Sequence, residues 1–193
     1  MDMKNNSCFK DIESILISEE EINQIVERIA DDISNDYRER VEAGNKLLLL
    51  CILKGSVVFM GELMKRISLP VEIDFMKVSS YGRSTTSSGS INIMLDLYRN
   101  DLPDTDIIII EDIIDSGRTL SYLVEYLRLK GAKSVSTCTL LDKPDRREVE
   151  FTPDYIGKVI DDVFVVGYGL DFAEKYRALP YVGILKPSAY ENK

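Results

Sequence analysis

The stretch DIIIIEDIIDSGRTL, residues 106–120, constrains the fold more than any other part of the chain. Its isoleucines, Ile107–Ile110, would be apolar on both faces of a strand, as is typical of a central strand in a parallel sheet. A stripe with the spacing of one helix face follows, at Leu120, Leu123, Val124 and Leu127. Gly131 stands where the C-terminus of that helix is expected. A buried strand that leads directly into a helix predicts an α/β domain.

Strands and helices alternate along the rest of the chain. Ser18 and Glu21 form a capping-box pattern ahead of a helical stripe that begins at Ile22. Further strands are predicted at residues 47–53, 71–75, 91–97, 134–141, 163–166 and 182–185, and a helical segment at 55–67. The order predicts one domain over residues 1–193, with a central, mainly parallel twisted sheet flanked by helices. A small hood lobe is expected from the N- and C-terminal segments. A long hairpin is expected to belong to the same lobe, with a flexible, Ser- and Gly-rich loop at Tyr81–Ser90.

Composition excludes several classes of function. The 193 residues carry a net charge of −9, which argues against nucleic acid and membrane surfaces as partners. The chain contains no histidine, so His-based catalytic triads and His-based zinc sites are excluded. Three widely spaced cysteines and the absence of an apolar N-terminal segment predict reduced thiols and a cytoplasmic location.

Three carboxylates, Glu111, Asp112 and Asp115, follow the isoleucine strand, where ligands gather in α/β sheets. The N–H groups of Ser116–Thr119 at the start of the next helix predict a phosphate-binding turn. Glu111 and Asp112 suit sugar hydroxyls or a hydrated Mg²⁺, and Asp115 is left for proton transfer. The residues thus favour a phosphorylated sugar as ligand, although a merely solvated polar turn is the alternative for an isolated acidic pair.

Three other motifs were weighed against this interpretation. The Walker pattern GxxxxGK[ST] is absent, which disfavours a P-loop nucleoside triphosphatase. Gly167-Tyr168-Gly169 begins like a dinucleotide fingerprint, but Phe172 replaces the third glycine. Asp142-Lys143-Pro144 suits a phosphoacceptor receiver domain, yet too few strands separate it from the acidic residues.

Five motifs in order resemble the hypoxanthine (guanine) phosphoribosyltransferases, within the type I phosphoribosyltransferase family. They are LKGS at 53–56, SSYG at 79–82, EDIIDSG at 111–117, DKP at 142–144 and VVGYGLD at 165–171. The similarity extends from DIESILISEEEI at 11–22 to VGILKP at 182–187. It implies the transfer of a phosphoribosyl group from phosphoribosyl pyrophosphate to a 6-oxopurine base, with Mg²⁺ as cofactor and a homodimer or homotetramer as the assembly.

The resemblance also implies a role for each matching residue. Asp115, Ser116, Gly117, Arg118 and Thr119 would bind the 5′-phosphate of phosphoribosyl pyrophosphate, with Glu111 and Asp112 on its ribose and metal, and Asp115 would be the general base at purine N7. Lys54, Gly55 and Arg177 would bind pyrophosphate, with the Leu53–Lys54 peptide often cis in relatives. Ile113, Lys143, Phe164, Val165 and Asp171 would form the purine side. Glu111, Asp112 and Asp171 would hold Mg²⁺, and the loop with Ser80 and Tyr81 would close over the reaction.

Alternatives remain open at the level of function. Leu95 stands where bacterial relatives typically have a lysine, so no lysine contact from that strand is expected. A phosphoribosyltransferase for xanthine or a pyrimidine is one alternative. A phosphoribosyl-pyrophosphate-sensing regulator that binds nucleic acid is another, which the charge of −9 disfavours.

Overall fold

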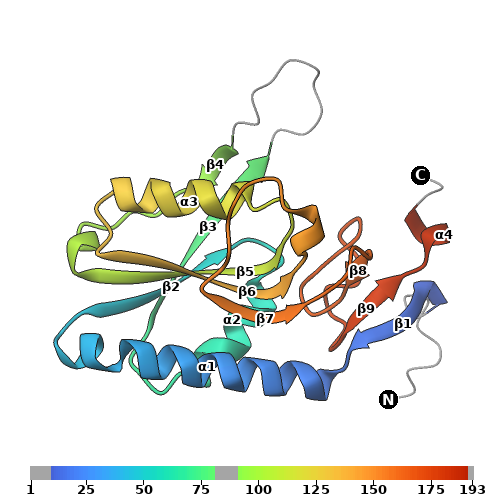
Figure 1. The fold of residues 1–193 in the computed structure, drawn as a ribbon, viewed down its shortest axis with the longest axis horizontal. Coiled ribbons are helices and arrows are strands. Elements are labelled where there is room, and N and C mark those ends of the chain that lie inside the picture. Colours follow the sequence, from blue (N-terminus) through green and yellow to red (C-terminus); the bar gives the residue numbers. More distant parts are fainter. Residues whose placement is uncertain (1–9, 81–90, 191–193) are drawn as a thin grey trace.

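The computed structural model describes residues 10–80 and 91–190, which form two sheets of different size (Figure 1). The larger sheet has the strand order β4-β3-β2-β5-β6-β7 and the smaller one the order β1-β9-β8. Strands of the larger sheet are β2 (Lys46–Ile52), β3 (Glu72–Ser80), β4 (Ile91–Leu95), β5 (Thr105–Ile114), β6 (Ser134–Asp142) and β7 (Tyr155–Val159). Strands of the smaller sheet are β1 (Ile12–Ile17), β8 (Val165–Val166) and β9 (Val182–Leu185). The α-helices are α1 (Glu19–Glu42), α2 (Val57–Met64), α3 (Arg118–Leu129) and α4 (Pro187–Tyr190).

The larger sheet confirms the predicted α/β architecture. Its strands β3, β2, β5, β6 and β7 are parallel, and β4 alone joins antiparallel, to β3. The β3–β4 hairpin therefore belongs to the main sheet, and the expectation that it joins the hood was wrong. Backbone pairing explains the difference, because β3 lies beside β2 in register from Leu48–Glu72 to Ile52–Met76.

The isoleucine strand β5 lies between two hydrophobic layers. Ile108 and Ile110 pack in the core that contains α1 and α2, whereas Ile107 and Ile109 pack in the core that contains α3. All four side chains are fully buried, because successive residues of a strand point to opposite faces and both faces of the sheet are covered. Figure 1 shows α3 on one side of the sheet and α1 with α2 on the other. This double burial fixes the strand that ends in the acidic residues.

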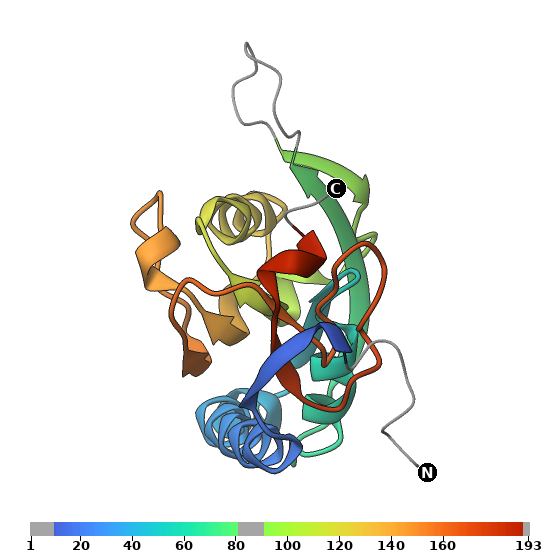
Figure 2. The ribbon, with the colours of Figure 1, turned by 90° about the vertical axis from the view of Figure 1, so that its right-hand side faces the viewer.

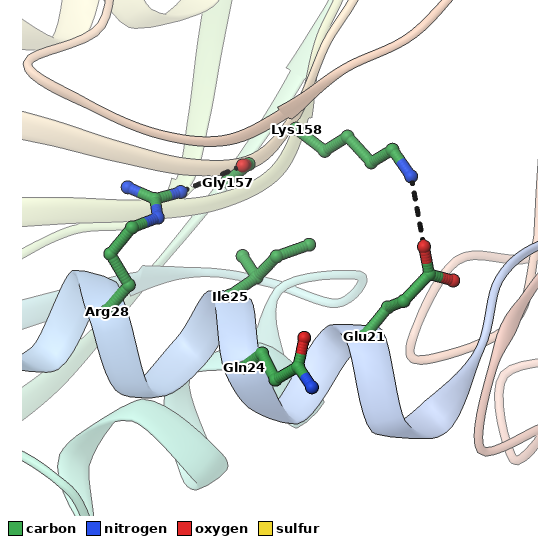
Figure 3. Close-up of a pocket in the computed structure, with 6 residues that line it drawn as sticks. All are labelled: Glu21, Gln24, Ile25, Arg28, Gly157 and Lys158. Carbon is green, nitrogen blue, oxygen red and sulfur yellow. Dashed lines mark hydrogen bonds and ion pairs between the residues drawn. The ribbon is translucent and has the colours of Figure 1, made fainter.

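Helix α1 starts at the predicted capping box and packs on one face of the sheet, next to edge strand β7. Ser18 accepts a hydrogen bond from Glu21 N, and the Glu21 carboxylate accepts one from Ser18 N at 2.9 Å. Arg28 donates to the carbonyls of Ile156 and Gly157, both at 2.9 Å, and so attaches α1 to edge strand β7 (Figure 3). A surface hollow of about 380 Å³ lies between α1 and β7 and contains the Lys158–Glu21 ion pair.

The small sheet joins segments from the two ends of the described chain (Figure 2). Strand β9 pairs antiparallel with both β1 and β8. Lys186 N donates to Asp11 O at 2.9 Å, and the Tyr176 hydroxyl donates to the Asp11 carboxylate at 2.7 Å. The hood expected from N- and C-terminal segments corresponds to this sheet.

Several boundaries differ from those expected. Strand β5 continues to Ile114, so Glu111 and Asp112 lie within the strand and not beyond it. Helix α2 ends at Met64, whereas helical structure was expected to Ile67. Strands β1 and β7 were not predicted. Cys51 and Cys138 are buried free thiols, as expected, and Cys8 lies outside the described residues. No described helix combines the length and apolar character that a bilayer crossing requires.

Candidate active site

A tight turn at the end of β5 forms the centre of the candidate site. Gly117 adopts the left-handed conformation with φ +79° and is the N-cap of α3, which requires a residue without a Cβ penalty. Ser116 Oγ accepts a hydrogen bond from Arg118 N at 3.4 Å. The turn borders a pocket of about 120 Å³, which is lined by Glu111, Ile113, Ile114, Asp115, Ser116, Gly117, Thr119 and Leu120. The predicted phosphate-binding residues 115–117 and 119 thus share one cavity with Glu111.

Glu111 and Asp112, near the end of β5, point to opposite faces of the sheet. Glu111 lines the pocket beside α3, whereas Asp112 faces α2, where its carboxylate lies against Gly55. Burial, and then the charge of Asp112, raises the pKa of Glu111 well above its ordinary value. Burial also raises the pKa of Asp112 to about 6, although Ile113 N donates to its carboxylate at 3.0 Å. Within the described residues neither carboxylate has an ion-pair partner, so both favour a ligand that supplies positive charge or hydroxyl donors.

Gly55 and Gly169 allow the main sheet and the loop after β8 to approach each other closely beside Asp112. A Cβ on Gly55 would lie 1.6 Å from Asp112 Oδ2, and a Cβ on Gly169 would lie 2.0 Å from Gly55 O. Gly169 also has φ +102°, in the left-handed region. The Leu53–Lys54 peptide is cis, the form that is frequent in the family that the motifs resemble. The two close approaches hold the backbone at Gly55 between the acidic strand and residues 167–170.

The residues expected to bind pyrophosphate gather around the loop at 169–177. Arg177 forms an ion pair with Asp171 at 2.8 Å and donates to Gly169 O at 2.8 Å. Glu174 bridges the two cations, with its carboxylate 3.1 Å from Lys54 Nζ and 3.4 Å from Arg177 Nη2. Arg177 Nε is buried and has no hydrogen-bond partner in the described structure, so this guanidinium keeps one free donor.

Three of the expected purine-binding residues, Lys143, Phe164 and Val165, lie at the ends of β6 and β8, whereas Ile113 is in β5 and Asp171 in the loop after β8. Lys143 is buried, with 7% of its surface exposed, and its Nζ lies 3.7 Å from Asp162. Phe164 is 39% exposed and stacks on Tyr190 with ring centres 4.9 Å apart. Phe164 O accepts a hydrogen bond from Leu185 N at 2.8 Å, so the main-chain groups of the next residue, Val165, point away from β9.

The carboxylates expected to hold Mg²⁺ do not form a ready-made cage. Among the described residues, no group of three or more acidic, Cys or His side chains has the arrangement of a metal site. Asp171 lies near enough to raise the pKa of Asp112, but it is paired with Arg177. Mg²⁺ commonly takes only one or two protein carboxylates beside substrate phosphates and water. Glu111 and Asp112, which lack a cation partner in this part of the chain, fit that mode.

Some expected residues lie apart from the pocket or cannot be placed. The Arg118 side chain is exposed and pairs with Glu148 at 2.5 Å. Ser80 ends β3, and Tyr81 lies outside the described residues, so the predicted closing loop is not placed. Leu95 is 45% exposed at the end of β4.

Three residues with direct contacts to the site were missed from the sequence. They are Glu174, which bridges Lys54 and Arg177, Tyr190, which stacks on Phe164, and Arg147, which contacts the phosphate turn. Each contact joins segments distant in sequence, and no local pattern of residues signals it. The larger hollow beside α1 contains none of the predicted site residues.

A central strand with an acidic pair near its end, a left-handed glycine turn and a helix N-terminus form the arrangement expected of a site for a phosphorylated ribose. The chain belongs to the phosphoribosyl transferase domain family, whose model matches residues 16–173. It is 50% identical over 182 residues to the hypoxanthine-guanine phosphoribosyltransferase of Bacillus subtilis, a match that covers 94% of this chain and 98% of the relative.

Two further comparisons agree with this family, one with a longer protein and one with a solved structure. The bifunctional protein TilS/HprT of Listeria monocytogenes is 48% identical over 97% of this chain, but the match spans only 28% of that protein. A hypoxanthine phosphoribosyltransferase structure from Staphylococcus aureus is 43% identical, with a TM-score of 0.90 and coverage of 98% of this chain and 100% of that one. The type I phosphoribosyltransferase fold predicted from the motifs is confirmed.

Proposed function

We propose that this chain is a purine salvage enzyme that forms a nucleoside monophosphate from a 6-oxopurine and phosphoribosyl pyrophosphate. The observation that carries the proposal is the pocket shared by Glu111 and the turn at residues 115–119, at the end of the central strand. Near full-length similarity to hypoxanthine-guanine phosphoribosyltransferases supports hypoxanthine, and guanine, as the base.

The phosphate turn and the acidic pair bind the two parts of the phosphoribosyl group. The 5′-phosphate accepts hydrogen bonds from the main-chain N–H groups of residues 116–119 and from the hydroxyls of Ser116 and Thr119, at the positive end of α3. Glu111 and Asp112 accept hydrogen bonds from the ribose hydroxyls. Lys54, Gly55 and Arg177 contact the pyrophosphate, and Arg177 is paired with Asp171 before the ligand binds.

The purine binds between β5 and the small sheet. Lys143 donates to the exocyclic oxygen at C6, an interaction that a 6-amino group cannot accept. Phe164 stacks on the base, Ile113 packs on its other side, and the outward main-chain groups of Val165 meet its edge.

Asp115 is the general base. Purine N9 attacks C1 of the ribose, the bond from C1 to the pyrophosphate oxygen breaks, and the N7 proton passes to the Asp115 carboxylate. Asp115 is exposed at the mouth of the pocket, where a base can reach it. The negative charges at the end of β5 stabilise the positive charge that develops at C1.

Mg²⁺ is the cofactor that this donor set fits. When bound, it supplies charge neutralisation for the pyrophosphate as it leaves. Glu111, Asp112 and Asp171 are the residues that would hold it, the last after release from Arg177.

A base panel tests this function directly. Protein, Mg²⁺ and phosphoribosyl pyrophosphate are offered hypoxanthine, guanine, xanthine, adenine and uracil in turn, and nucleotide formation is measured. We expect product from hypoxanthine or guanine and none from adenine. Product only from xanthine or uracil would redirect the assignment of the base, and binding without any product would favour a sensor of phosphoribosyl pyrophosphate.

We also propose that the chain assembles as a homodimer or homotetramer, in line with the resemblance. Size-exclusion chromatography with light scattering tests this, and a mass near 21.9 kDa would contradict it.

A further inference from the structure

The segment after β6, residues 144–151, lies directly against the phosphate turn. Glu148 N and Val149 N both donate to Ser116 O, at 3.0 and 3.3 Å. A Cβ on Gly117 would lie 2.9 Å from Arg147 Cδ and 3.2 Å from Val149 Cγ2. None of these three residues of the segment lines the pocket, so the segment acts on the turn from outside the pocket.

Arg147 is the centre of this contact. Its guanidinium donates to Asp115 O through Nη1, to the Asp142 carboxylate through Nη2 and to Phe151 O through Nε, the last at 3.0 Å. The Arg147 side chain is 15% exposed and that of Asp142 is 7% exposed. Bonds between charged groups at such depth are stronger than exposed ones, and removing one partner leaves a buried carboxylate unpaired.

These bonds fix the direction of the amides that face the phosphate. In a trans peptide the carbonyl and the following N–H point in opposite directions. Arg147 holds the Asp115 carbonyl, so the N–H of Ser116 points away from the segment. The bonds to Ser116 O orient the N–H of Gly117 in the same way. Both N–H groups are therefore set for the pocket before any phosphate arrives.

Asp142 connects this anchor to the purine side. It is the last residue of β6 and directly precedes Lys143, whose N donates to Ile114 O at 3.0 Å. One guanidinium thus ties the carbonyl of the catalytic Asp115 to the strand end that carries Lys143.

We propose that Arg147 is a positioning residue, which holds the Asp115–Ser116 peptide in its phosphate-binding orientation and fixes Asp115 relative to Lys143. The inference rests on the proposed function and deepens it. Preorganised amides bind phosphate without the cost of ordering the turn, so the effect of Arg147 falls first on the affinity for phosphoribosyl pyrophosphate.

The test compares Arg147→Ala, Arg147→Lys and Arg40→Ala with the unmodified protein. Arg40 lies 3.3 Å from Asp106, a buried carboxylate at the opposite end of β5, so Arg40→Ala is a matched loss of a cation far from the turn. Calorimetry with phosphoribosyl pyrophosphate and Mg²⁺ gives Kd, steady-state kinetics give kcat and KM for each substrate, and melting gives Tm.

In Arg147→Ala we expect Kd and KM for phosphoribosyl pyrophosphate to rise roughly tenfold or more, with a smaller change in KM for the base. Lysine keeps a cation beside Asp142 but lacks the planar fork whose separate nitrogens reach all three acceptors, so Arg147→Lys should recover part of the affinity. Arg40→Ala should lower Tm and leave Kd unchanged.

Three results would decide against this role. Equal loss of affinity in Arg147→Ala and Arg40→Ala would mean that only stability is at stake. An unchanged Kd in Arg147→Lys, if Arg147→Ala does not fold, would also overturn it. Absence of binding by the unmodified protein would instead reject the proposed function, and this role with it.

Discussion

At the scale of single residues, the surroundings of Asp112 disfavour its ionised form. Its carboxylate lies against the backbone of Gly55 and forms no ion pair in the described structure, and burial raises its pKa to about 6. A carboxylate in this state is costly for the free protein but ready for a ligand with hydroxyl donors or a metal ion. The site therefore trades stability for binding, as active sites commonly do.

We predict that Asp112→Asn stabilises the free protein and weakens its activity. The pKa of Asp112 is higher in the folded protein than the ordinary 3.8, so the folded state binds the extra proton. The free energy of unfolding then falls as pH rises from about 4 to about 6, and the loss is complete above that range. Asparagine removes this loss, so at pH 7.5 the variant should gain about 1–3 kcal/mol. Urea unfolding at pH 4.5 and 7.5 measures it, and an equal gain at both would contradict the cause.

We predict that Glu174→Ala strengthens inhibition by pyrophosphate. Glu174 pairs with both Lys54 and Arg177, and these ion pairs must break when an anion binds to the two cations. Its removal frees Lys54 and leaves Arg177 paired with Asp171 alone, so we expect the inhibition constant of pyrophosphate to fall a few-fold, since exposed pairs are individually weak. Product-inhibition kinetics measure this, with Glu125→Ala, an exposed change on α3, as the control. A weaker inhibition would show that Glu174 helps to position the cations.

At the scale of elements, most strands and α3 were predicted from their apolar or alternating patterns, whereas β1 and β7 were missed. Strand β9 was predicted at its observed bounds, and α3 follows its stripe, because each packs an apolar surface into the core. Strand β7 was missed because Gly157 and Lys158 interrupt its short run, and its partners lie elsewhere in the chain.

The candidate site divides in the same way. Residues 111–119 were identified from local sequence, since strand, acids, glycine turn and helix are consecutive there. The partnership of Arg147 with Asp115 spans 32 residues, and that of Lys54 with Glu174 spans 120. Such contacts depend on how the sheets are assembled, so the spacing of residues within one segment does not reveal them.

The short helix α4 bears on the purine side through its last residue. Tyr190 stacks on Phe164, and Phe172 contacts the same ring edge-on with centres 5.6 Å apart. We predict that Tyr190→Ala loosens Phe164 and raises KM for the base up to about tenfold, with little change in KM for phosphoribosyl pyrophosphate. Tyr190→Phe keeps the ring and should behave as the unmodified protein. Steady-state kinetics decide, and an equal rise in both KM values would contradict a local effect.

At the scale of the whole molecule, the main sheet carries the turn that we propose binds phosphate, and the small sheet carries Val165, part of the proposed purine side. The two meet where Gly169 lies against Gly55 O. We predict that Gly169→Ala lowers the free energy of unfolding by about 2–4 kcal/mol and abolishes most activity, through backbone strain and collision together.

Gly44→Ala is the matched control for this prediction. Gly44 has φ +97°, close to that of Gly169, but nothing lies within 4 Å of an added Cβ. It should show the cost of the left-handed conformation alone, about 1–2 kcal/mol, with activity retained. Chemical unfolding and specific activity of both variants separate the two effects, and equal behaviour would show that the contact with Gly55 is unimportant.

The small sheet can form only late in the synthesis of the chain on the ribosome. Strand β9 is its central strand, and without it neither β1 nor β8 has a partner in that sheet. The main sheet and its phosphate turn are complete in sequence by residue 159, whereas β9 ends at Leu185. Phe164 and Val165, on the proposed purine side, therefore gain their neighbouring strand β9 only when nearly all of the described chain has been made. A chain that stops before Val182 would lack the small sheet altogether.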